Sequence, residues 1–334
     1  MNPDARRARG WLRRLALSHF VVLAVALLPT LSIAQPYPNK PIKLVVPFPP
    51  GGAVDFYART VQQPLSEALG QTVVIENRAG ASGMVGAEAV ARSPADGYTI
   101  MLGNIAALAI NVGIYPKMTY DPVRDFTPIT HTVDVNYALI VHPSVPAKSV
   151  AELVAYAKAN PGKLSYGSAG SGSLPHLATE LFKSQAGIDM THVPYKGGGP
   201  MVTDLLGGTV QMVIADQANL MPHVKAGKLR ALAVSSPKRS TNYPDLPTIA
   251  ESGFPGFQAT AWNGLVGPAG LSPDVVSKLN TAFVKVQSTP EIRDKLVAGG
   301  LDPVGDRPEE FAAYIKSEIA TWSRISKAVG AKAE

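Results

Sequence analysis

Short apolar runs alternate with segments of helical period along this chain. The run 42–46, Ile-Lys-Leu-Val-Val, predicts a buried strand, and the apolar positions of 54–69 recur at the spacing of an amphipathic helix. The same order returns with a strand at 72–76, a helix that ends near residue 93 and a strand at 98–102. Strands that alternate with helices predict a doubly wound α/β fold, in which ligands collect at the carboxyl ends of the strands.

A second α/β run follows the predicted strands 126–131 and 137–141. Its predicted strands are 163–166, 190–193, 210–215 and 229–234. Its predicted helices are 150–160, 174–186, one that follows the turn 194–200 and ends at about 206, and 220–226. A strand at 262–268 then leads back to the first domain. Three helices close the chain at 273–287, 290–298 and 308–327, each with a proline near its first turn. No flexible linker separates the two runs, so we expect two domains that are joined by strands.

Residues 1–34 have the order of parts that is typical of a secretory signal. A basic segment precedes the apolar run 15–31, and the small residues Ser32 and Ala34 follow at the positions that favour cleavage after Ala34. The alternative is an uncleaved membrane anchor, because the apolar run is close to spanning length. Arg13-Arg14 leaves Sec and twin-arginine export both open. We expect a protein of the periplasm.

Composition narrows the function classes. The chain has 334 residues, 46% of them hydrophobic and 17% charged, which allows a sizeable core and suits two domains. It has no cysteine, which excludes disulfides, thiol nucleophiles and cysteine-ligated metals. The net charge is +6, and five arginines against one aspartate place +4 of it in the first 34 residues. The rest lacks the basic surplus of nucleic-acid-binding proteins, so we expect no nucleic-acid partner.

The segment 47–55, Pro-Phe-Pro-Pro-Gly-Gly-Ala-Val-Asp, joins the first predicted strand to the first predicted helix. Gly51 and Gly52 let backbone N–H groups come close to a ligand, and the first N–H groups of a helix have no intrahelical partner. With the positive end of the helix dipole, these groups predict a site for an anion, most simply a carboxylate. The alternative is an ordinary strand-to-helix loop in which Asp55 is a cap or a first-turn acid.

Two later strand-to-helix turns, 167–173 and 194–200, are also rich in glycine and small residues. Their N–H groups could converge with those of 47–55 on one oxygen-rich solute across a cleft. In the second turn Lys196 could add a positive charge and Tyr195 a hydroxyl group and a ring. The alternative for Lys196 is a solvated loop residue.

Two polar residues end predicted strands. Asn104 ends the third strand, beside the first loop if the strand order is the usual one, and is a candidate contact or a loop cap. Asp216 follows the strand 210–215 and would repel a carboxylate. It therefore suits an amino group or a hydroxyl, or it caps the next turn.

Signals for catalysis are weak. The glycines at 80, 83 and 86 do not match the dinucleotide fingerprint, and no serine of 167–173 has glycine at both −2 and +2, as a nucleophile elbow requires. The histidines after residue 34 show no metal-ligand spacing, so we expect no metal and no cofactor. A set of Ser171, His176 and Asp216 could be assembled, but His176 also fits a capped first-turn residue. Binding is favoured over catalysis.

Short motifs spread from about residue 36 to the tail match a known pattern. They are YPNKPI at 37–42, VVPFPPGG at 45–52 with Asp55, ENRAGA at 76–81, DGYT at 96–99, YGSAGSGS at 166–173 with His176-Leu177, HVPYKG at 192–197, DLLGG at 204–208, GKLRALAV at 227–234, PDLPT at 244–248 and GFPGF at 253–257. Together they resemble the Bug family, the extracytoplasmic solute receptors of tripartite tricarboxylate transporters. The resemblance covers the whole mature chain.

The resemblance implies a type II periplasmic-binding-protein fold with two α/β domains around a cleft. Domain one would comprise 36–137 and 260–334, and domain two 138–259. The family's first loop holds one solute carboxylate through backbone groups and ordered water, and its serine-glycine loop donates from the facing domain. Carried onto this chain, these roles and the candidates above give Phe48, Gly51, Gly52, Ala53, Asp55, Asn104, Ser168, Ala169, Gly170, Ser171, His176, Tyr195, Lys196 and Asp216.

The sequence thus predicts a non-catalytic, monomeric receptor. Its solute would be a small organic acid, either a di- or tricarboxylate, an aromatic carboxylate or an amino acid, delivered by hinge closure to the permease subunits of a tripartite tricarboxylate-type transporter. Two alternatives stay open: an exported enzyme that acts on a small carboxylate, and a sensor subunit that signals through a membrane kinase. The runs 103–107 and 217–220 depart from the family pattern near the pocket, so the solute cannot be transferred from a relative.

Overall fold

The computed structural model describes residues 37–240 and 242–331. The elements described below belong to the compact unit Lys40–Glu334. The predicted signal segment 1–34 lies outside the described residues. Within those residues, the helices are too short or too polar to cross a membrane.

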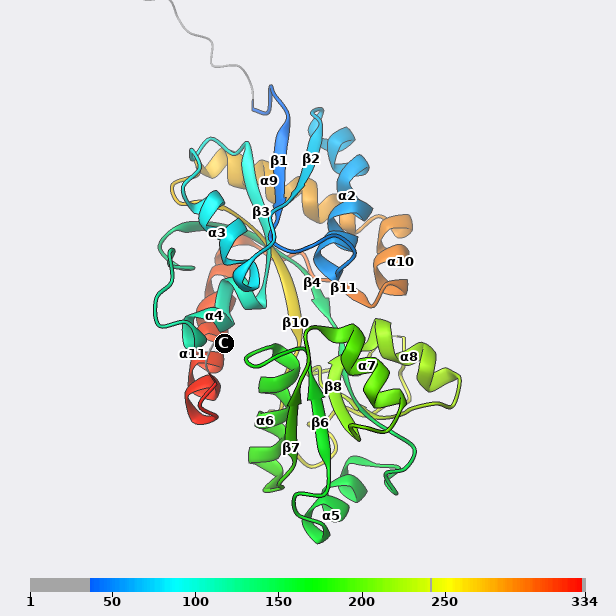
Figure 1. Cartoon of the computed structure of the whole chain (residues 1–334). Helices are drawn as coiled ribbons and strands as arrows, with labels where there is room; N and C mark the ends of the chain where they lie inside the picture. Colours follow the sequence, from blue (N-terminus) through cyan, green and yellow to red (C-terminus); the bar gives the residue numbers. More distant parts are fainter. Residues whose placement is uncertain (1–36, 241, 332–334) are drawn as a thin grey trace, which may run out of the picture. The chain divides into compact units, whose positions relative to one another are not determined.

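The first sheet has six strands in the order β11-β4-β10-β3-β1-β2. β1 (Ile42–Val46) pairs in parallel with β2 (Val73–Asn77) and β3 (Thr99–Asn104). β10 (Ala261–Pro268) lies antiparallel between β3 and β4 (Phe126–Val135), and β11 (Leu301–Pro303) extends the edge at β4. A strand from late in the chain therefore runs through the middle of this sheet (Figure 1).

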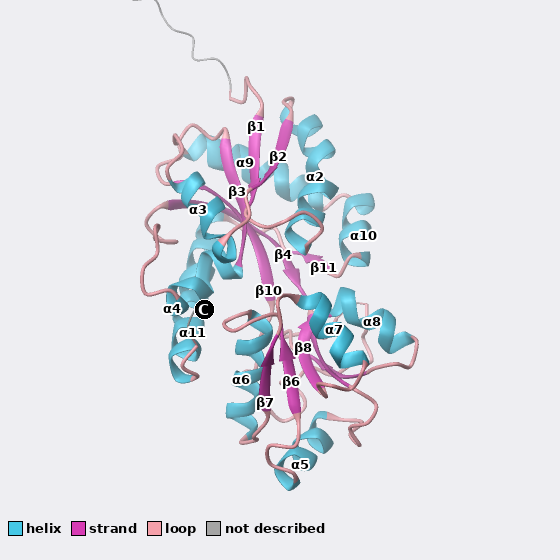
Figure 2. Ribbon diagram, viewed as in Figure 1, coloured by secondary structure: helices cyan, strands magenta, loops and turns pink. Residues whose placement is uncertain are grey.

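Helices pack around this sheet in two groups (Figure 2). In the first group α2 (Ala53–Leu69), α9 (Pro273–Gln287) and α10 (Pro290–Ala298) pack on one another. In the second group α11 (Pro308–Ala328) packs on β4, on the π-helical turn η2 (Ala106–Ile110) and on α4 (Asn111–Ile114). The turn η1 (Ala81–Gly83) and α3 (Met84–Ala91) connect β2 to β3.

The second sheet has five strands in the order β7-β6-β8-β5-β9. They are β5 (Tyr137–Val141), β6 (Ser165–Ser168), β7 (Thr191–Pro194), β8 (Met212–Asp216) and β9 (Arg230–Val234). The helices of this part are α5 (Val150–Ala159), α6 (Leu174–Ala186), α7 (Gly198–Leu206) and α8 (Gln217–Lys225). The predicted doubly wound α/β class is confirmed in both sheets.

The chain passes between the two sheets twice. β4 and β5 are separated by Asn136 alone, and the return passes through the segment before β10. The two passages lie side by side, because the N–H of Ser235 donates to Tyr137 O at 3.0 Å and the N–H of Ala259 donates to Ser235 O at 3.0 Å. Buried Asn136 is fixed by its amide, which donates to Asp302 Oδ2 at 2.5 Å.

Four parts of the secondary structure differ most from the sequence prediction, and one of them is β4, which ends at Val135 instead of 131. β11 was not predicted, because three residues that end in proline carry no period. The helical residues 106–114 were not predicted either, because most of this run is apolar and buried, which hides a helical stripe. α8 begins at Gln217 instead of 220, since the carboxylate of Asp216 accepts the N–H of Ala218 at 2.7 Å and caps the helix there.

Candidate functional site

Two adjoining cavities lie where loops of the two sheets meet. Cavity A, of about 390 Å³, is lined by Phe48, Pro49, Pro50, Gly52, Ala53, Val54, Asn104, Val135, Tyr137, Asp216, Ala261 and Asn263. Cavity B, of about 600 Å³, is lined by Phe48, Ser82, Asn104, Ile105, Ala106, Ile110, Asn111, Ile114, Tyr115, Tyr137, Ala169 to Pro175 and Ala261. Phe48, Asn104, Tyr137 and Ala261 line both cavities, so one solute can reach from one into the other.

The loop 47–55 is held in place by the carboxylate of Asp55. Its Oδ2 accepts the N–H of Gly51 at 2.9 Å and the Nε of Arg59 at 2.8 Å. The amide of Asn77 donates to Asp55 Oδ1 at 2.9 Å and to the carbonyl of Phe48 at 3.1 Å. Burial raises the pKa of the Asp55 carboxyl, but the hydrogen bonds from Arg59, Asn77 and Gly51 outweigh it and bring the pKa to about 2. Asp55 is therefore ionised and shapes the loop.

The first turn of α2 offers backbone donors to cavity A. Gly52 stands at the N-cap position and has no side chain to cap the helix, and the first helical hydrogen bond inside this turn is from Phe56 N to Gly52 O. The N–H groups of Ala53 and Val54 precede that bond, and both residues line the cavity. They add the positive end of the helix dipole to the site.

An unpaired amide lies in the same cavity. Asn263 sits in β10 directly across from Asn104 in β3, and its side chain is 2% exposed. Its Nδ2 has no hydrogen-bond partner among the described residues. A buried donor without a partner costs about 1–3 kcal/mol, so such a group points to a ligand that completes it. Asn104 is oriented by its Oδ1, which accepts the N–H of Ala107 at 3.1 Å.

Asp216 carries the one charged side chain that lines cavities A and B in the part of the chain that the structure describes. Burial raises the pKa of its carboxyl above the ordinary value, and the N–H of Ala218 works against this shift. The capping role that the sequence left open is present, because Asp216 is the N-cap of α8.

The serine-glycine loop after β6 uses much of its hydrogen-bonding capacity on itself. The N–H of Gly170 donates to Ser168 Oγ at 3.2 Å, and the N–H of Gly172 donates to His176 Nδ1 at 3.0 Å. Ser173 donates both its N–H, at 3.1 Å, and its hydroxyl, at 2.7 Å, to the carbonyl of Gly170. These bonds fix the shape of the loop where it lines cavity B.

Two stacked histidines lie behind this loop. The rings of His176 and His192 have centroids 4.0 Å apart and planes within 9°. Ser168 is fully buried, and its Oγ lies 2.7 Å from His192 Nε2. Burial lowers the pKa of His176. The charge of Glu180 raises this pKa by a smaller amount, and the charge of Lys183 lowers it. Because His176 accepts an N–H at Nδ1, its neutral form supports the loop.

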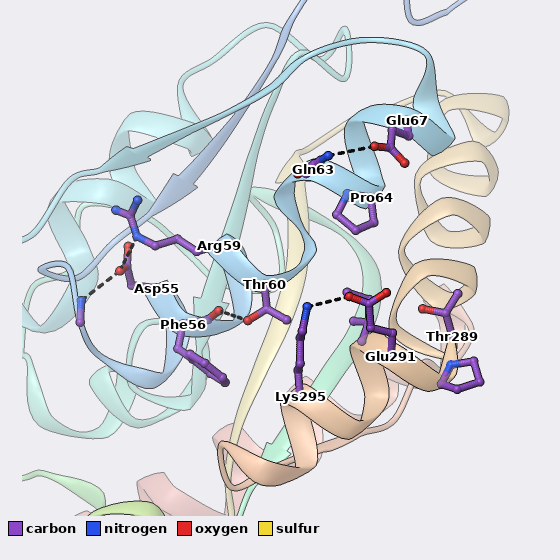
Figure 3. A pocket seen from close by; sticks show the side chains of 13 residues that line it. Asp55, Phe56, Arg59, Thr60, Gln63, Pro64, Glu67, Thr289, Glu291 and Lys295 are labelled. Atoms are coloured by element: carbon purple, nitrogen blue, oxygen red, sulfur yellow. Dashed lines mark hydrogen bonds and ion pairs between the residues drawn. The ribbon is translucent and has the colours of Figure 1, made fainter.

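A third cavity, cavity C, lies between α2 and α10 (Figure 3). It has a volume of about 1130 Å³ and is lined by outer faces of these helices, including Asp55, Arg59, Glu291 and Lys295. Asp55 pairs with Arg59 at 2.8 Å and Glu291 with Lys295 at 2.7 Å, while Glu67 accepts from the amide of Gln63 at 3.2 Å. Apart from Gly51 and the N-cap residue Thr289, its lining residues belong to the helices α2 and α10.

A family model described as "Tripartite tricarboxylate transporter family receptor" matches residues 57–331. The chain belongs to this family. It is 39% identical over 300 residues to protein BugT of Bordetella pertussis, covering 90% of this chain and 92% of BugT. It is also 36% identical over 313 residues to a protein encoded in the gbd 5′ region of Cupriavidus necator, covering 93% and 94% of the two chains.

Solved structures of the family have the same fold. R. palustris Rpa4515 with adipate matches with 40% identity and a TM-score of 0.78, covering 89% of this chain and all of that one. MatC from Rhodopseudomonas palustris with bound malate matches with 31% identity and a TM-score of 0.73, covering 86% and 99%. The predicted family and the predicted periplasmic-binding-protein fold are confirmed. This family member is a solute-binding receptor, and its relatives are periplasmic transport proteins.

The structure brings most of the residues expected of such a receptor to cavities A and B. Those that line them are Phe48, Gly52, Ala53, Asn104, Ala169, Gly170, Ser171 and Asp216. Gly51 and Asp55 line cavity C instead, while Ser168 and His176 support the serine-glycine loop from behind. Tyr195 donates its hydroxyl to Asp204 at 2.7 Å, and exposed Lys196 follows it; neither lines cavity A or B.

Among the residues that line cavity A, sequence reasoning missed Val135, Tyr137, Ala261 and Asn263. Asn263 had a signal, because it is a polar residue inside the apolar strand run Trp262–Val266. No group of histidine or acidic side chains in the described residues has an arrangement that could hold a metal ion.

Proposed function

We propose that this receptor captures a small organic anion by a carboxylate that docks in cavity A. The observation that carries the proposal is the unpaired Nδ2 of buried Asn263, which lines the same cavity as the free N–H groups of the first turn of α2. A carboxylate oxygen accepts hydrogen bonds from both kinds of donor, and the helix dipole favours its charge. Relatives solved with adipate and with malate support an organic acid as the solute.

The proposed mechanism is closure of two domains on the solute. Residues 36–137 with 260–334 would form one domain and 138–259 the other, with the two side-by-side passages as the hinge. Both sheets contribute lining residues, for example Asn104 and Asp216 in cavity A, so a solute that contacts both stabilises the closed state. The closed receptor would then deliver the solute to the permease subunits of a tripartite tricarboxylate-type transporter.

The cellular setting belongs to the same proposal. Residues 1–34 would direct export to the periplasm, where the mature chain would act as a monomer without cofactor or nucleic-acid partner. A sensor that passes the closed form to a membrane kinase would use the same cavity. A pull-down of the closed, solute-loaded receptor with the permease subunits would distinguish transport from sensing.

The alternative that this protein is an enzyme has little support in the arrangement of the site. In the serine-glycine loop, the hydroxyl that lies against a histidine belongs to Ser168, which is fully buried, at 2.7 Å from His192. Its hydroxyl also donates to the carbonyl of Gly170 at 3.1 Å. A nucleophile must reach its substrate, and this hydroxyl does not line cavity A or B.

The test combines a ligand screen with two asparagine variants. Native mass spectrometry and thermal-shift assays against carboxylic acids should give a stabilising acid that is recovered unchanged, since a ligand of the native state raises its stability by mass action. Conversion of the acid to a product would favour the enzyme instead. Asn263→Leu should weaken binding about tenfold or more, because a hydrogen bond to a charged group is lost.

Asn280→Leu is the matched control. The amide of Asn280 is satisfied, since its Nδ2 donates to Ile129 O and to Asp306 O at 2.9 Å each, and it lines neither cavity. This variant should lower stability and keep affinity, whereas Asn263→Leu should keep stability and lose affinity. Full affinity in folded Asn263→Leu would overturn the proposed anchor.

A further inference from the structure

Cavities A and B differ in what they can offer a charged group. Cavity A contains the unpaired Nδ2 of Asn263 and the first N–H groups of α2. Among the described residues that line cavity B, lysine, arginine and histidine side chains are absent. A charge that leaves water needs a partner or several hydrogen bonds, so the contents of cavity B restrict what can enter it.

One side of cavity B is an apolar wall. It is formed by Ile105, Ile110 and Ile114 from the helical run after β3, which are 3%, 1% and 6% exposed, and it includes the half-buried Ala106. Leu174 of α6 lines the cavity from the second sheet. These side chains favour a hydrocarbon surface on the solute.

Asn104 and Tyr137 line both cavity A and cavity B, and several of the other polar groups of cavity B are already paired. Asn111 is 2% exposed, and its Nδ2 donates to the carbonyl of Ser82 at 3.1 Å. The hydroxyls of Ser82 and Tyr115 lie 3.4 Å apart.

The serine-glycine loop that lines cavity B already uses several of its backbone donors. The N–H groups of Gly170, Gly172 and Ser173 all bond within the loop or to His176 behind it. Pro175 has no N–H, which removes one donor from the first turn of α6. A second carboxylate in cavity B would therefore find no cationic side chain among the described lining residues, and several of the loop's backbone donors are already used.

We infer that the solute of this receptor is a monocarboxylate with an uncharged apolar body, whose body lies against the wall 105–114. The inference rests on the proposed carboxylate anchor in cavity A and adds the class of the remaining part of the solute. It separates this chain from relatives of the family that were solved with the dicarboxylates adipate and malate.

The test uses pairs of acids that differ only in the second carboxylate: hexanoate with adipate, and benzoate with terephthalate. Isothermal titration calorimetry at pH 7 should show at least one monocarboxylate binding about tenfold or more tightly than its partner, the fold change that corresponds to 1.4 kcal/mol. Hexanamide, which keeps the body and removes the charge, should bind more weakly than hexanoate.

A charge placed on the wall should reverse the preference. Ala106→Lys gives a second carboxylate a cation, so the ratio of adipate to hexanoate affinity should rise about threefold or more. Ala106→Gln has similar length without the charge and should leave the ratio unchanged. Thermal unfolding of both variants checks that they are folded.

The outcomes separate the two proposals. Dicarboxylates that bind as tightly as their monocarboxylate partners, or an acid such as malate that binds while both monocarboxylates do not, would overturn the inference and leave the carboxylate receptor standing. The absence of binding by every carboxylic acid tested would overturn the proposed function itself, and the inference with it.

Discussion

The carboxylate of Asp55 accepts the backbone N–H of Gly51 at 2.9 Å. Through this bond an acidic residue in the first turn of α2 holds the preceding loop in position. Asp55 lines cavity C (Figure 3) and is not among the residues that line cavity A. Its influence on the solute is therefore indirect, through the position of the loop. A group of this kind affects stability and affinity together.

Asp55→Asn should lower the free energy of unfolding at pH 7 by on the order of 2 kcal/mol, the scale set by a pKa held near 2 instead of near 3.8. Because the folded-state pKa is lowered, this contribution is present above about pH 4 and disappears as the pH falls from 3.8 toward 2. Urea unfolding of both proteins across this range measures the difference. A difference that did not shrink in acid would contradict the role of the charge.

Gly52→Val should fold and lose affinity. Gly52 has φ −84° and ψ 172°, which any residue adopts, and a Cβ there would meet no atom within 4 Å. The cost at this N-cap position is about 1 kcal/mol, while the branched side chain blocks approach to the first N–H groups of α2. Thermal unfolding would check that the variant folds, and calorimetry with the acid found by the screen would measure its affinity. A folded variant with unchanged affinity would contradict the placement of the carboxylate site at this loop.

Gly86→Ala is the contrasting variant. A Cβ at Gly86 would lie 2.7 Å from Pro47 Cβ and 2.9 Å from Arg78 O, so the loop or α3 must shift. The expected loss of stability is about 1–3 kcal/mol. Its position behind the loop predicts a smaller loss of affinity than that of Gly52→Val at a temperature where both are folded.

Asp216→Asn should strengthen anion binding. Asparagine keeps the cap on α8, because its side-chain oxygen can accept the N–H of Ala218, and it removes the negative charge from cavity A. Burial raises the pKa of Asp216 in the folded protein, so its effect on stability becomes unfavourable as the pH rises above 3.8. The variant should therefore gain stability relative to the native protein between pH 4 and pH 7, measured by thermal unfolding. Weaker anion binding would instead mean that Asp216 holds a hydroxyl or an amino group.

His176→Asn should flatten the pH dependence of stability. Burial lowers the pKa of His176 below 6.5, so the stability of the native protein should fall as the pH drops from about 6.5. The oxygen of asparagine can still accept the N–H of Gly172 without titrating. The groups that face His176 and could share the effect are His192, Tyr166, Glu180 and Lys183. Unfolding curves at pH 7, 6 and 5 measure how the stability of each protein changes with pH. Equal changes in the native protein and in His176→Asn would assign the pH dependence to one of these neighbours.

The sequence was sufficient for features that repeat at short range. The apolar spacing of 54–69 placed α2, and its predicted positions, such as Tyr57 and Leu65, are fully buried. The loop 47–55 was recognised as a strand-to-helix turn beside the site. The sequence did not show whether this loop is an anion site or an ordinary loop capped by Asp55. The hydrogen-bond partners of Asp55 include Asn77, which lies on another strand.

Features that depend on distant segments could not be predicted. Asn263 became unpaired and buried because β10 is inserted between β3 and β4, and no local pattern reports such an insertion. The support of the serine-glycine loop by His176 and His192 likewise joins α6 to β7. The run 106–114 was hidden for a different reason, since a segment that is apolar almost all round has no polar face to mark its period.

The lack of lysine and arginine among the described residues that line cavities A and B has one more consequence. A receptor that attracts its ligand with full positive charges depends on long-range forces that dissolved salt screens within about 8–10 Å. Amide groups and a helix end act at contact distance, so salt screens their attraction much less. The attraction of such a site for an anion should therefore weaken little when salt is added.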